Sequence, residues 1–394
     1  MIYLDNAATT YPKPDCVYDA VDRFNRTSAV NAGRSAYKKA IEATEMIKNT
    51  KAELLRLCNA EKEAAVVIAP SATVALNQII HGQKWDSTKN AYVSFYEHNS
   101  VMRPLSLAKE RHGFQIRAIP HRKEDLSLDL EATRAAFEKY RPDFVVLSAI
   151  SNVTGYILPA PEIFAMAKEY GAFTVLDAAQ ALGFLPMDFK ELNADAIVFA
   201  GHKTLYSTFG AAGFILRSGA PLDVFLTGGN GIKSTLLKMP DTAPEKYEAG
   251  SPDTPAIAGL QAALQWRKTV GDMYSREKEL MEYLIAGLES IPEVTVYKAP
   301  GGIDRQGGVV SFNLSDLSCS VVGIVLNEKH DIAVRVGHHC APAIHAYLKD
   351  MKNNGTVRVS ISYFTTKDDI DALIAAVRGI DLAEARKIPP MQTC

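Results

Sequence analysis

The sequence predicts an α/β protein with two domains, the larger of which contains a mainly parallel, seven-stranded sheet. The chain has 394 residues, which is more than one hydrophobic core usually organises. Apolar runs alternate with helical segments through residues 64–217. Beyond residue 255 the pattern changes to a long helical stretch followed by further strands, which indicates a second, smaller α+β domain.

Seven short apolar runs are expected to form the large sheet. They lack polar alternation, which is typical of strands that are buried on both faces. Helical segments separate most of them, which indicates βαβ units with right-handed crossovers. The expected strands are residues 64–69, 91–95, 115–119, 143–150, 173–179, 195–201 and 212–217.

The domain boundary is expected near residue 255. Residues 1–15 are expected to pack across the domain join, residues 16–255 to form the large domain, and residues 256–394 to form the smaller one. The smaller domain should contain a helical stretch, four strands and a last helix, at residues 256–291, 294–299, 307–314, 333–337, 356–362 and 368–380.

Composition excludes several classes of protein. The net charge of −2 offers no electrostatic footprint for nucleic acid or for an anionic membrane. The sequence contains no apolar run long enough to cross a bilayer, and it starts without the features of a signal peptide. We therefore expect a cytoplasmic protein with reduced thiols at its five cysteines, which are Cys16, Cys58, Cys319, Cys340 and Cys394.

Polar side chains follow five of the expected strands at their carboxyl ends. Ligands of open α/β sheets bind at this edge, so these side chains are expected to share one site. In chain order they are Ser71 to Thr73, Glu97 and His98, Asn152 and Thr154, Asp177 and Gln180, and His202 and Lys203.

Each of these residues has an ordinary structural interpretation beside a functional one. Lys203 alone would be a solvated surface lysine, but in a cleft its pKa would fall and its amine could attack an aldehyde. Asp177 lies in an apolar run and needs a cationic partner, either a protein side chain or a protonated pyridine nitrogen. His98 could be a hydrogen-bonded strand-end histidine. Residues 71–73 suit an N-cap and also a phosphate-binding turn.

Four segments resemble motifs of one enzyme family. EHNSV, SNVTG, LDAAQ and AGHK, in this order, resemble the class V aminotransferase family of fold-type I transferases, which depend on pyridoxal 5′-phosphate (PLP). The segment RVGHHCAP narrows the resemblance to the cysteine desulfurases and the related selenocysteine lyases, and it extends from YLDNAATT to the last helix. The resemblance implies a PLP enzyme that acts on cysteine or selenocysteine, with an aminotransferase as the further alternative.

The resemblance also implies roles for individual residues. Lys203 would carry PLP as a Schiff base and move the Cα proton, and His98 would stack on the cofactor ring. Cys340 would accept sulfur from L-cysteine as a persulfide, which leaves L-alanine. Asp177 would pair with the pyridine nitrogen. The other implied cofactor contacts are Ala72, Thr73, Asn152, Gln180, His202 and Ser251.

Further implications concern substrate and partners. Arg358 would grip the substrate carboxylate in a two-pronged contact, with Asn152 and Arg335 also near the substrate. Ser251 would reach the phosphate of a neighbouring subunit, which implies a homodimer with shared sites. A sulfur-acceptor protein would then collect the persulfide sulfur.

Cys340 has two neighbouring histidines, His338 and His339, in the sequence. They and Arg335 would favour its thiolate form. The alternatives are an inert loop thiol and a metal-binding histidine pair. We expect no metal, because a third ligand at suitable spacing is missing from the sequence.

The sequence departs from the family pattern at two places. Ala200 stands where a serine often helps to bind phosphate, at a cost of ~1 kcal/mol for one hydrogen bond. The loop around Arg34 replaces a histidine-bearing loop that faces the substrate. Whether the preferred substrate carries sulfur or selenium therefore stays open. The Cys340 segment also lacks a long insertion found in one subgroup. A PLP-binding regulator is a non-enzymatic alternative, but it would need a basic DNA-binding segment that the sequence lacks.

Overall fold

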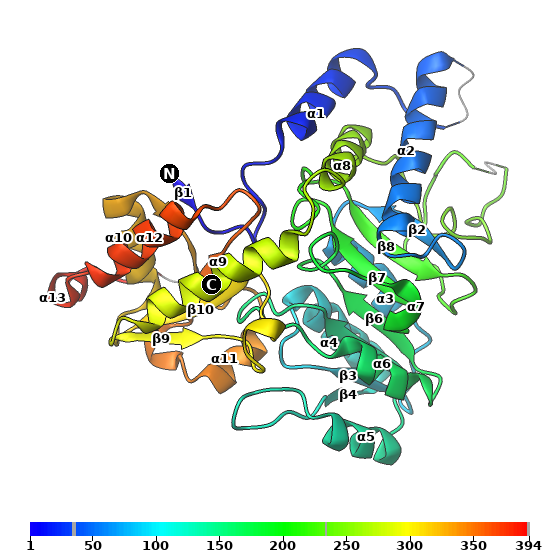
Figure 1. The fold of residues 1–394 in the computed structure, drawn as a ribbon. Helices are drawn as coiled ribbons and strands as arrows, with labels where there is room; N and C mark the ends of the chain where they lie inside the picture. Colours follow the sequence, from blue (N-terminus) through cyan, green and yellow to red (C-terminus); the bar gives the residue numbers. More distant parts are fainter. Residues whose placement is uncertain (34–36, 233–234, 392–394) are drawn as a thin grey trace.

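A computed structural model describes residues 1–33, 37–232 and 235–391 (Figure 1). Its large sheet has seven strands in the order β2-β8-β7-β6-β5-β3-β4, which confirms the predicted mainly parallel, seven-stranded sheet. The strands are β2 (Ala64–Ala69), β3 (Asn90–Val93), β4 (Gln115–Ala118), β5 (Phe144–Ser148), β6 (Phe173–Asp177), β7 (Ala196–Ala200) and β8 (Ala212–Arg217).

Strand β8 runs antiparallel to both of its neighbours, β2 and β7. The segment 201–211 joins β7 to β8 and contains no helix, so it is too short for the crossover that a parallel pair needs. The chain therefore turns back directly after β7. The turn begins with Gly201, where a Cβ atom would lie only 2.2 Å from the carbonyl oxygen of Ala211.

Helices cover both faces of this sheet (Figure 1). Successive residues of β5 point to opposite faces: Val146 packs with α3 and α4, and Leu147 packs with α5 and α6. Burial on both faces explains why the central strands are continuous apolar runs. The helices here are α3 (Ala72–His81), α4 (Asn99–His112), α5 (Leu130–Lys139), α6 (Ala160–Lys168) and α7 (Phe189–Leu192).

The predicted helical stretch 256–291 is two helices, α8 (Thr254–Arg267) and α9 (Met273–Glu289). Gly271 adopts a φ of +69° between them, and the side chain of Asp272 accepts a hydrogen bond from Ser275 N at the start of α9. A left-handed glycine followed by an N-cap residue ends one helix and starts another.

The helix α8 belongs with the large domain. Its residues Ile257 and Leu260 share the core of the large sheet, and the helix packs against α1 (Asp15–Thr27) and α2 (Lys38–Leu57), which lie outside the predicted elements. The predicted boundary near residue 255 lies at the start of this helix, and we propose the break between α8 and α9 as the division between the domains.

A second core holds the smaller domain together. Its antiparallel sheet has the order β12-β13-β10-β9, and α9, α10 and α12 contribute to the same core. The expected strand 333–337 is divided, because Ala333 pairs with the N-terminal strand β1 (Ile2–Tyr3) instead. The remaining elements are β9 (Val294–Tyr297), β10 (Val309–Leu314), α10 (Cys319–His330), β11 (Ile332–Ala333), β12 (Arg335–Gly337), α11 (Pro342–Leu348), β13 (Thr356–Ser360), α12 (Lys367–Arg378) and α13 (Leu382–Ala385).

The N-terminal segment touches both domains. Its strand β1 pairs in parallel with β11, and Leu4 lies in the core of the smaller domain. Further along, the Thr9 hydroxyl donates to the carbonyl oxygen of His202, in the turn after β7. Among the described residues, every helix is too short or too polar to cross a lipid bilayer.

A buried carboxyl group lies where α9 meets the turn after β7. Glu277 is 4% exposed, and the hydroxyl of Tyr206 hydrogen-bonds to it. Burial raises the pKa of Glu277 to about 8. The native protein therefore keeps this group neutral at pH 7, whereas an unfolded chain ionises it near its ordinary pKa of 4.5.

Replacing Glu277 with glutamine should reduce the loss of stability as the pH rises. Between pH 4.5 and about 8 the unfolded chain releases the Glu277 proton and the native chain does not. The free energy of unfolding of the parent should fall by up to about 1.4 kcal/mol per pH unit in this window. Denaturant unfolding at several pH values measures the difference between parent and variant. Equal pH dependence in the two proteins would show that Glu277 is ionised in the native state.

Candidate active site

A cavity of about 230 Å³ lies at the carboxyl ends of the strands of the large sheet. It collects residues that are far apart in the chain, from the N-terminal segment to β13. Of the predicted site residues, Glu97, Thr154 and Ser251 do not line it, and Glu97 and Thr154 are instead buried in the protein. Those that do line it are Ala72, Thr73, His98, Asn152, Asp177, Gln180, His202, Lys203, Arg335, Cys340 and Arg358. The structure therefore brings together the strand-end residues, the cysteine and the two arginines.

Lys203 lies in the turn that follows β7, and its backbone is hydrogen-bonded to Ala200 and to Tyr206. Its amide donates to Ala200 O and its carbonyl accepts from Tyr206 N. Desolvation lowers the pKa of Lys203 to about 8, and the negative charge of Asp177 partly opposes this shift. The lowered pKa makes the neutral amine, which is the form that attacks an aldehyde, more accessible near neutral pH than in an ordinary lysine.

Asp177 is the last residue of β6 and is 7% exposed. Its carboxylate accepts a hydrogen bond from Ala179 N at 3.0 Å. Burial raises the pKa of Asp177, and the Ala179 amide and Lys203 only partly oppose this. Within the described residues, no lysine or arginine lies at ion-pair distance from it. The site thus contains a buried carboxylate that would be stabilised by a cation bound in the cavity.

His98 is the N-cap of α4. Its Nδ1 accepts a hydrogen bond from Ser100 N at 3.0 Å, so the ring proton lies on Nε2. Desolvation, with a smaller effect of Lys203, lowers the pKa of His98 to about 3. The ring is therefore a neutral aromatic surface on the cavity wall. The histidine is thus hydrogen-bonded, as its structural interpretation predicts, and it also lines the cavity.

The N-terminus of α3 and His202 form another wall. Ser71 is the N-cap of α3, and its hydroxyl accepts from Val74 N at 3.2 Å, so the structural interpretation of this turn is correct. Ala72 and Thr73 line the cavity at this helix N-terminus, where backbone N–H groups favour an anion. Nearby, His202 Nδ1 is buried without a hydrogen-bond partner among the described residues.

Two amides line the cavity and tie its parts together. The Asn152 side chain donates to His339 O at 2.7 Å. The Gln180 side chain donates to Ala7 O, in the N-terminal segment, at 2.8 Å. Each side chain thus joins the end of a central strand to a segment from a different part of the chain.

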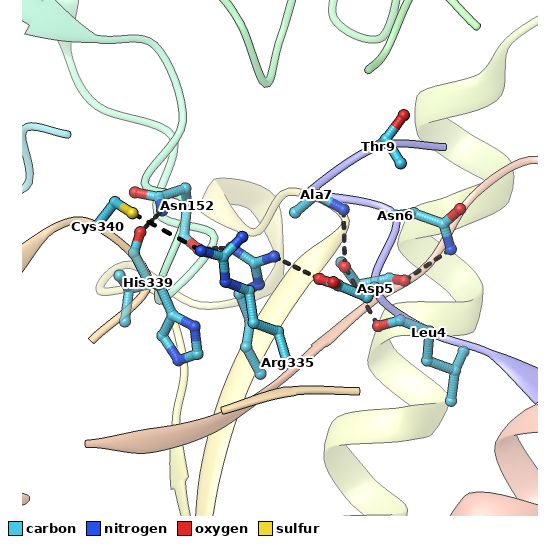
Figure 2. Close-up of polar contacts among 12 residues, drawn as sticks. Leu4, Asp5, Asn6, Ala7, Thr9, Asn152, Arg335, His339 and Cys340 are labelled. Atoms are coloured by element: carbon cyan, nitrogen blue, oxygen red, sulfur yellow. Dashed lines mark hydrogen bonds and ion pairs between the residues drawn. The ribbon is translucent and has the colours of Figure 1, made fainter. Parts of the chain in front are cut away.

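Cys340 follows β12 and presents an exposed thiol at the cavity. Arg335 Nη2 lies 3.7 Å from Cys340 Sγ, and Figure 2 shows the two side chains facing each other beside Asn152. A guanidinium N–H thus lies beside the sulfur atom that the sequence predicts as the sulfur acceptor.

Three contacts hold the turn that contains Cys340. Both His339 and Cys340 adopt a positive φ, of 51° and 57°, which is unfavourable for residues with a Cβ atom. Three successive carbonyl groups of the turn each have a different donor. His345 Nε2 binds His338 O at 3.2 Å, Asn152 Nδ2 binds His339 O at 2.7 Å, and Asn99 N binds Cys340 O at 2.6 Å. The turn is thus held in one conformation beside the cavity.

The two arginines are directly opposite each other, on β12 and β13. Arg358 is 1% exposed; its Nη2 donates to Asp5 Oδ1 at 2.6 Å and its Nη1 to Asn152 O at 3.2 Å. Like charges at this spacing repel each other, which favours an anion bound between them. A carboxylate matches the fork of an arginine side chain.

Some predicted features lie elsewhere. Ser251 is exposed and does not line the cavity of its own chain. Arg34 and Cys394 lie outside the described residues. His339 is buried, and its Nε2 contacts the Thr356 hydroxyl at 2.9 Å. The described residues contain no group of three or more His, Cys, Asp or Glu side chains that could hold a metal ion.

Sequence reasoning missed Asn99, Asp5 and His345. Asn99 acts through its backbone N–H, so its side-chain type carries no signal. Asp5 lies in the quoted segment YLDNAATT, but its partner Arg358 is 353 residues away. His345 lies one turn into α11, where a histidine has no distinctive spacing.

Comparisons with known proteins agree with this geometry. The family described as aminotransferase class-V matches residues 2–373. The chain is 31% identical to a cysteine desulfurase of Enterobacter sp. (strain 638) and 30% identical to one of Salmonella dublin, in each case over 96% of this chain and 93% of the relative.

Solved structures agree as well. The apo structure of a cysteine desulfurase from Thermococcus onnurineus NA1 superposes with a TM-score of 0.85, at 26% identity, over 98% of this chain and 95% of the other. The cysteine desulfurase CsdA from Escherichia coli has a TM-score of 0.82, at 24% identity, over 98% and 94% of the two chains, and supports the fold.

Proposed function

The chain belongs to the class-V aminotransferase family, and from this premise we propose that it is a PLP-dependent cysteine desulfurase. It converts L-cysteine into L-alanine and passes the sulfur to Cys340 as a persulfide. The observation that carries this proposal is that the exposed thiol of Cys340 lines the same cavity as Lys203 and Asp177.

The residues of the cavity fit PLP on three structural grounds. Asp177 is a buried carboxylate that has no lysine or arginine at ion-pair distance in the described part of the chain, which suits a protonated pyridine nitrogen. His202 Nδ1 has no hydrogen-bond partner among the described residues and lines the cavity together with the N-terminus of α3, which suits a phosphate group. Lys203 has an amine with a lowered pKa, which suits an aldehyde. When bound, PLP supplies an electron sink for negative charge at the substrate Cα.

Residues of the chain perform the other steps. Arg358 binds the substrate carboxylate and Lys203 takes the Cα proton, and the neutral ring of His98 would help to hold the cofactor ring. The sulfur of Cys340, which lies beside Arg335, attacks the substrate sulfur. An S–S bond forms while the substrate Cβ–S bond breaks, and its electron pair stays on carbon, which is protonated to give L-alanine. One thiol and one L-cysteine thus yield one persulfide and one L-alanine, which balances the atoms.

The proposal extends to assembly and location. Ser251 is exposed and outside its own cavity, which suits a contact with the phosphate site of a second subunit in a homodimer. The exposed Cys340 thiol is accessible to a sulfur-acceptor protein or a small thiol. The described cysteines are free thiols, which suits a reducing cytoplasm.

Replacing Cys340 with alanine tests the proposed function. The variant should lose sulfide and alanine formation from L-cysteine by at least about 10²-fold, because no thiolate remains to take the sulfur. It should keep the visible absorbance of lysine-bound PLP, because Cys340 does not hold the cofactor. Coupled assays for alanine and sulfide measure the effect. Replacing Cys16, an exposed thiol on α1, is the matched control and should leave the rate unchanged.

Other results would assign a different reaction. Sulfide release by the Cys340→Ala variant at the parent rate would contradict the role of Cys340. Undiminished selenide release from selenocysteine, with sulfide release lost, would indicate a selenocysteine lyase. Amino transfer to a 2-oxo acid that does not depend on Cys340 would indicate an aminotransferase.

A further inference from the structure

The carboxylate of Asp5 is bound to the arginine that lines the active-site cavity. Asp5 Oδ1 accepts from Arg358 Nη2 at 2.6 Å, and the arginine side chain is 2% exposed. Arg358 lines the cavity, whereas Asp5 does not. The aspartate therefore contacts the guanidinium from outside the cavity.

The backbone around Asp5 is fixed independently of this ion pair. Its neighbours Leu4 and Asn6 both bind Ser360: Ser360 N donates to Leu4 O at 2.8 Å, and the Asn6 side chain donates to Ser360 O at 2.9 Å. Ala7 N adds a bond to the Ser360 hydroxyl at 2.8 Å. Figure 2 shows Leu4, Asp5, Asn6 and Ala7 in this arrangement.

Ser360 is two residues beyond Arg358 on β13, so both side chains point to the same face of the sheet. Bonds to Ser360 consequently set the position of the Asp5 carboxylate relative to the guanidinium. Arg335 lies opposite Arg358 and has no such carboxylate; its polar contact is with the Cys340 thiol. Of the two facing arginines, Arg358 alone is thus held by an acidic side chain among the described residues.

We propose that Asp5 is a positioning residue that makes Arg358 selective for the α-carboxylate of an amino acid. The inference rests on the proposed function, in which Arg358 binds that carboxylate. A guanidinium has five N–H donors. Asp5 takes one on Nη2 and the carbonyl of Asn152 takes one on Nη1. Nε is buried and has no hydrogen-bond partner among the described residues. The remaining Nη protons are left for a substrate carboxylate.

The ion pair also opposes rotation of the guanidinium. Repulsion from Arg335 would otherwise turn Arg358 away from the cavity, since both side chains are positively charged and face each other. Asp5 holds the planar group in one orientation, and a two-pronged contact with a carboxylate depends on that orientation. Loss of Asp5 should therefore weaken the binding of amino acids more than that of simple amines.

Competitive inhibition of the holoenzyme by L-alanine and by ethylamine tests this inference. The two inhibitors share an amine, and L-alanine alone has a carboxylate, so the inhibition constant of ethylamine divided by that of L-alanine measures carboxylate recognition. The Asp5→Asn variant should lower the ratio about tenfold, and Asp5→Glu should lower it less, because the charge is kept. The KM for L-cysteine should rise in parallel, with a smaller change in kcat.

Asp331→Asn is the matched control. Asp331 is an exposed acid whose ion pair with the amino group of Met1, at 2.6 Å, anchors the start of the same N-terminal segment. It does not contact Arg358, so the ratio should equal that of the parent. Arg358→Lys provides the reference for lost recognition and should lower the ratio at least as much as Asp5→Asn.

Other results of this experiment would contradict either the role of Asp5 or the role of Arg358. If Arg358→Lys lowers the ratio and Asp5→Asn does not, the inference about Asp5 is wrong and the proposed function stands. If Asp5→Asn lowers only kcat and thermal stability, its role is structural and the inference is also wrong. If Arg358→Lys leaves the ratio unchanged, the substrate-binding role of Arg358 in the proposed function is wrong. If Asp5→Asn does not fold, an unchanged ratio in Asp5→Glu, with KM also unchanged, overturns the inference.

Discussion

Replacing Lys203 with alanine is expected to reduce alanine formation from L-cysteine by at least about 10³-fold. The lysine provides two functions in the proposed mechanism, the amine that holds the cofactor and the base that takes the Cα proton. Its lowered pKa of about 8 makes both functions available near neutral pH, because the cavity desolvates the ammonium group. Steady-state assays of alanine formation measure the rate. Loss of the visible absorbance of lysine-bound PLP shows that the covalent bond between residue 203 and the cofactor is absent.

Lys203→Arg is the matched control for charge. It keeps a positive charge in the turn after β7, but a guanidinium does not become neutral in a protein and does not attack an aldehyde. The arginine variant should therefore be as inactive as the alanine variant. Added methylamine should restore part of the activity of Lys203→Ala by entering the vacated space as a neutral amine. Substantial turnover by either variant without added amine would contradict the role of Lys203.

Replacing Asp177 with asparagine should lower kcat by about 10²–10⁴-fold. The asparagine side chain has almost the same shape, but it lacks the negative charge that would keep a pyridine nitrogen protonated. Without that protonation, the ring is a poor acceptor of electrons from the substrate Cα. The buried position of Asp177 makes the effect large, because water cannot replace the lost charge.

The control for Asp177 is another buried acid of the same sheet. Asp195 precedes β7 at the opposite end of the strands and pairs with Lys168 and Arg217. Asp195→Asn should reduce stability while leaving kcat near that of the parent. Comparing kcat and the unfolding midpoint of the two variants separates a chemical effect from a structural one. A kcat for Asp177→Asn within a few-fold of the parent would show that the site does not depend on a charged ring nitrogen.

Local patterns predicted most of the large domain. The central strands β5, β6 and β7 are fully buried. A continuous apolar run indicates such burial on both faces of a sheet. The same pattern could not report the direction of β8, because direction depends on the length and path of the connection rather than on burial. It also missed the break at Gly271, because one residue with positive φ hardly alters the helical spacing of apolar residues around it.

The order of strands and polar residues along the chain was enough to predict most of the chemical groups at the edge of the large sheet. Parallel strands bring their carboxyl ends together, so residues that follow different strands, such as Asp177 and Lys203, share one site. The motif around Cys340 added a thiol, but its spacing did not say how that thiol would be held.

The way in which the smaller domain completes the site depends on long-range contacts that local patterns do not report. The contact of Asp5 with Arg358 joins residues 353 positions apart, and three separate elements hold the carbonyl groups of the Cys340 turn. Such contacts depend on how two independently packed cores meet, and hydrophobic periodicity reports only whether a residue is buried. The orientation of Arg358 and the position of Cys340 are therefore properties of the domain packing.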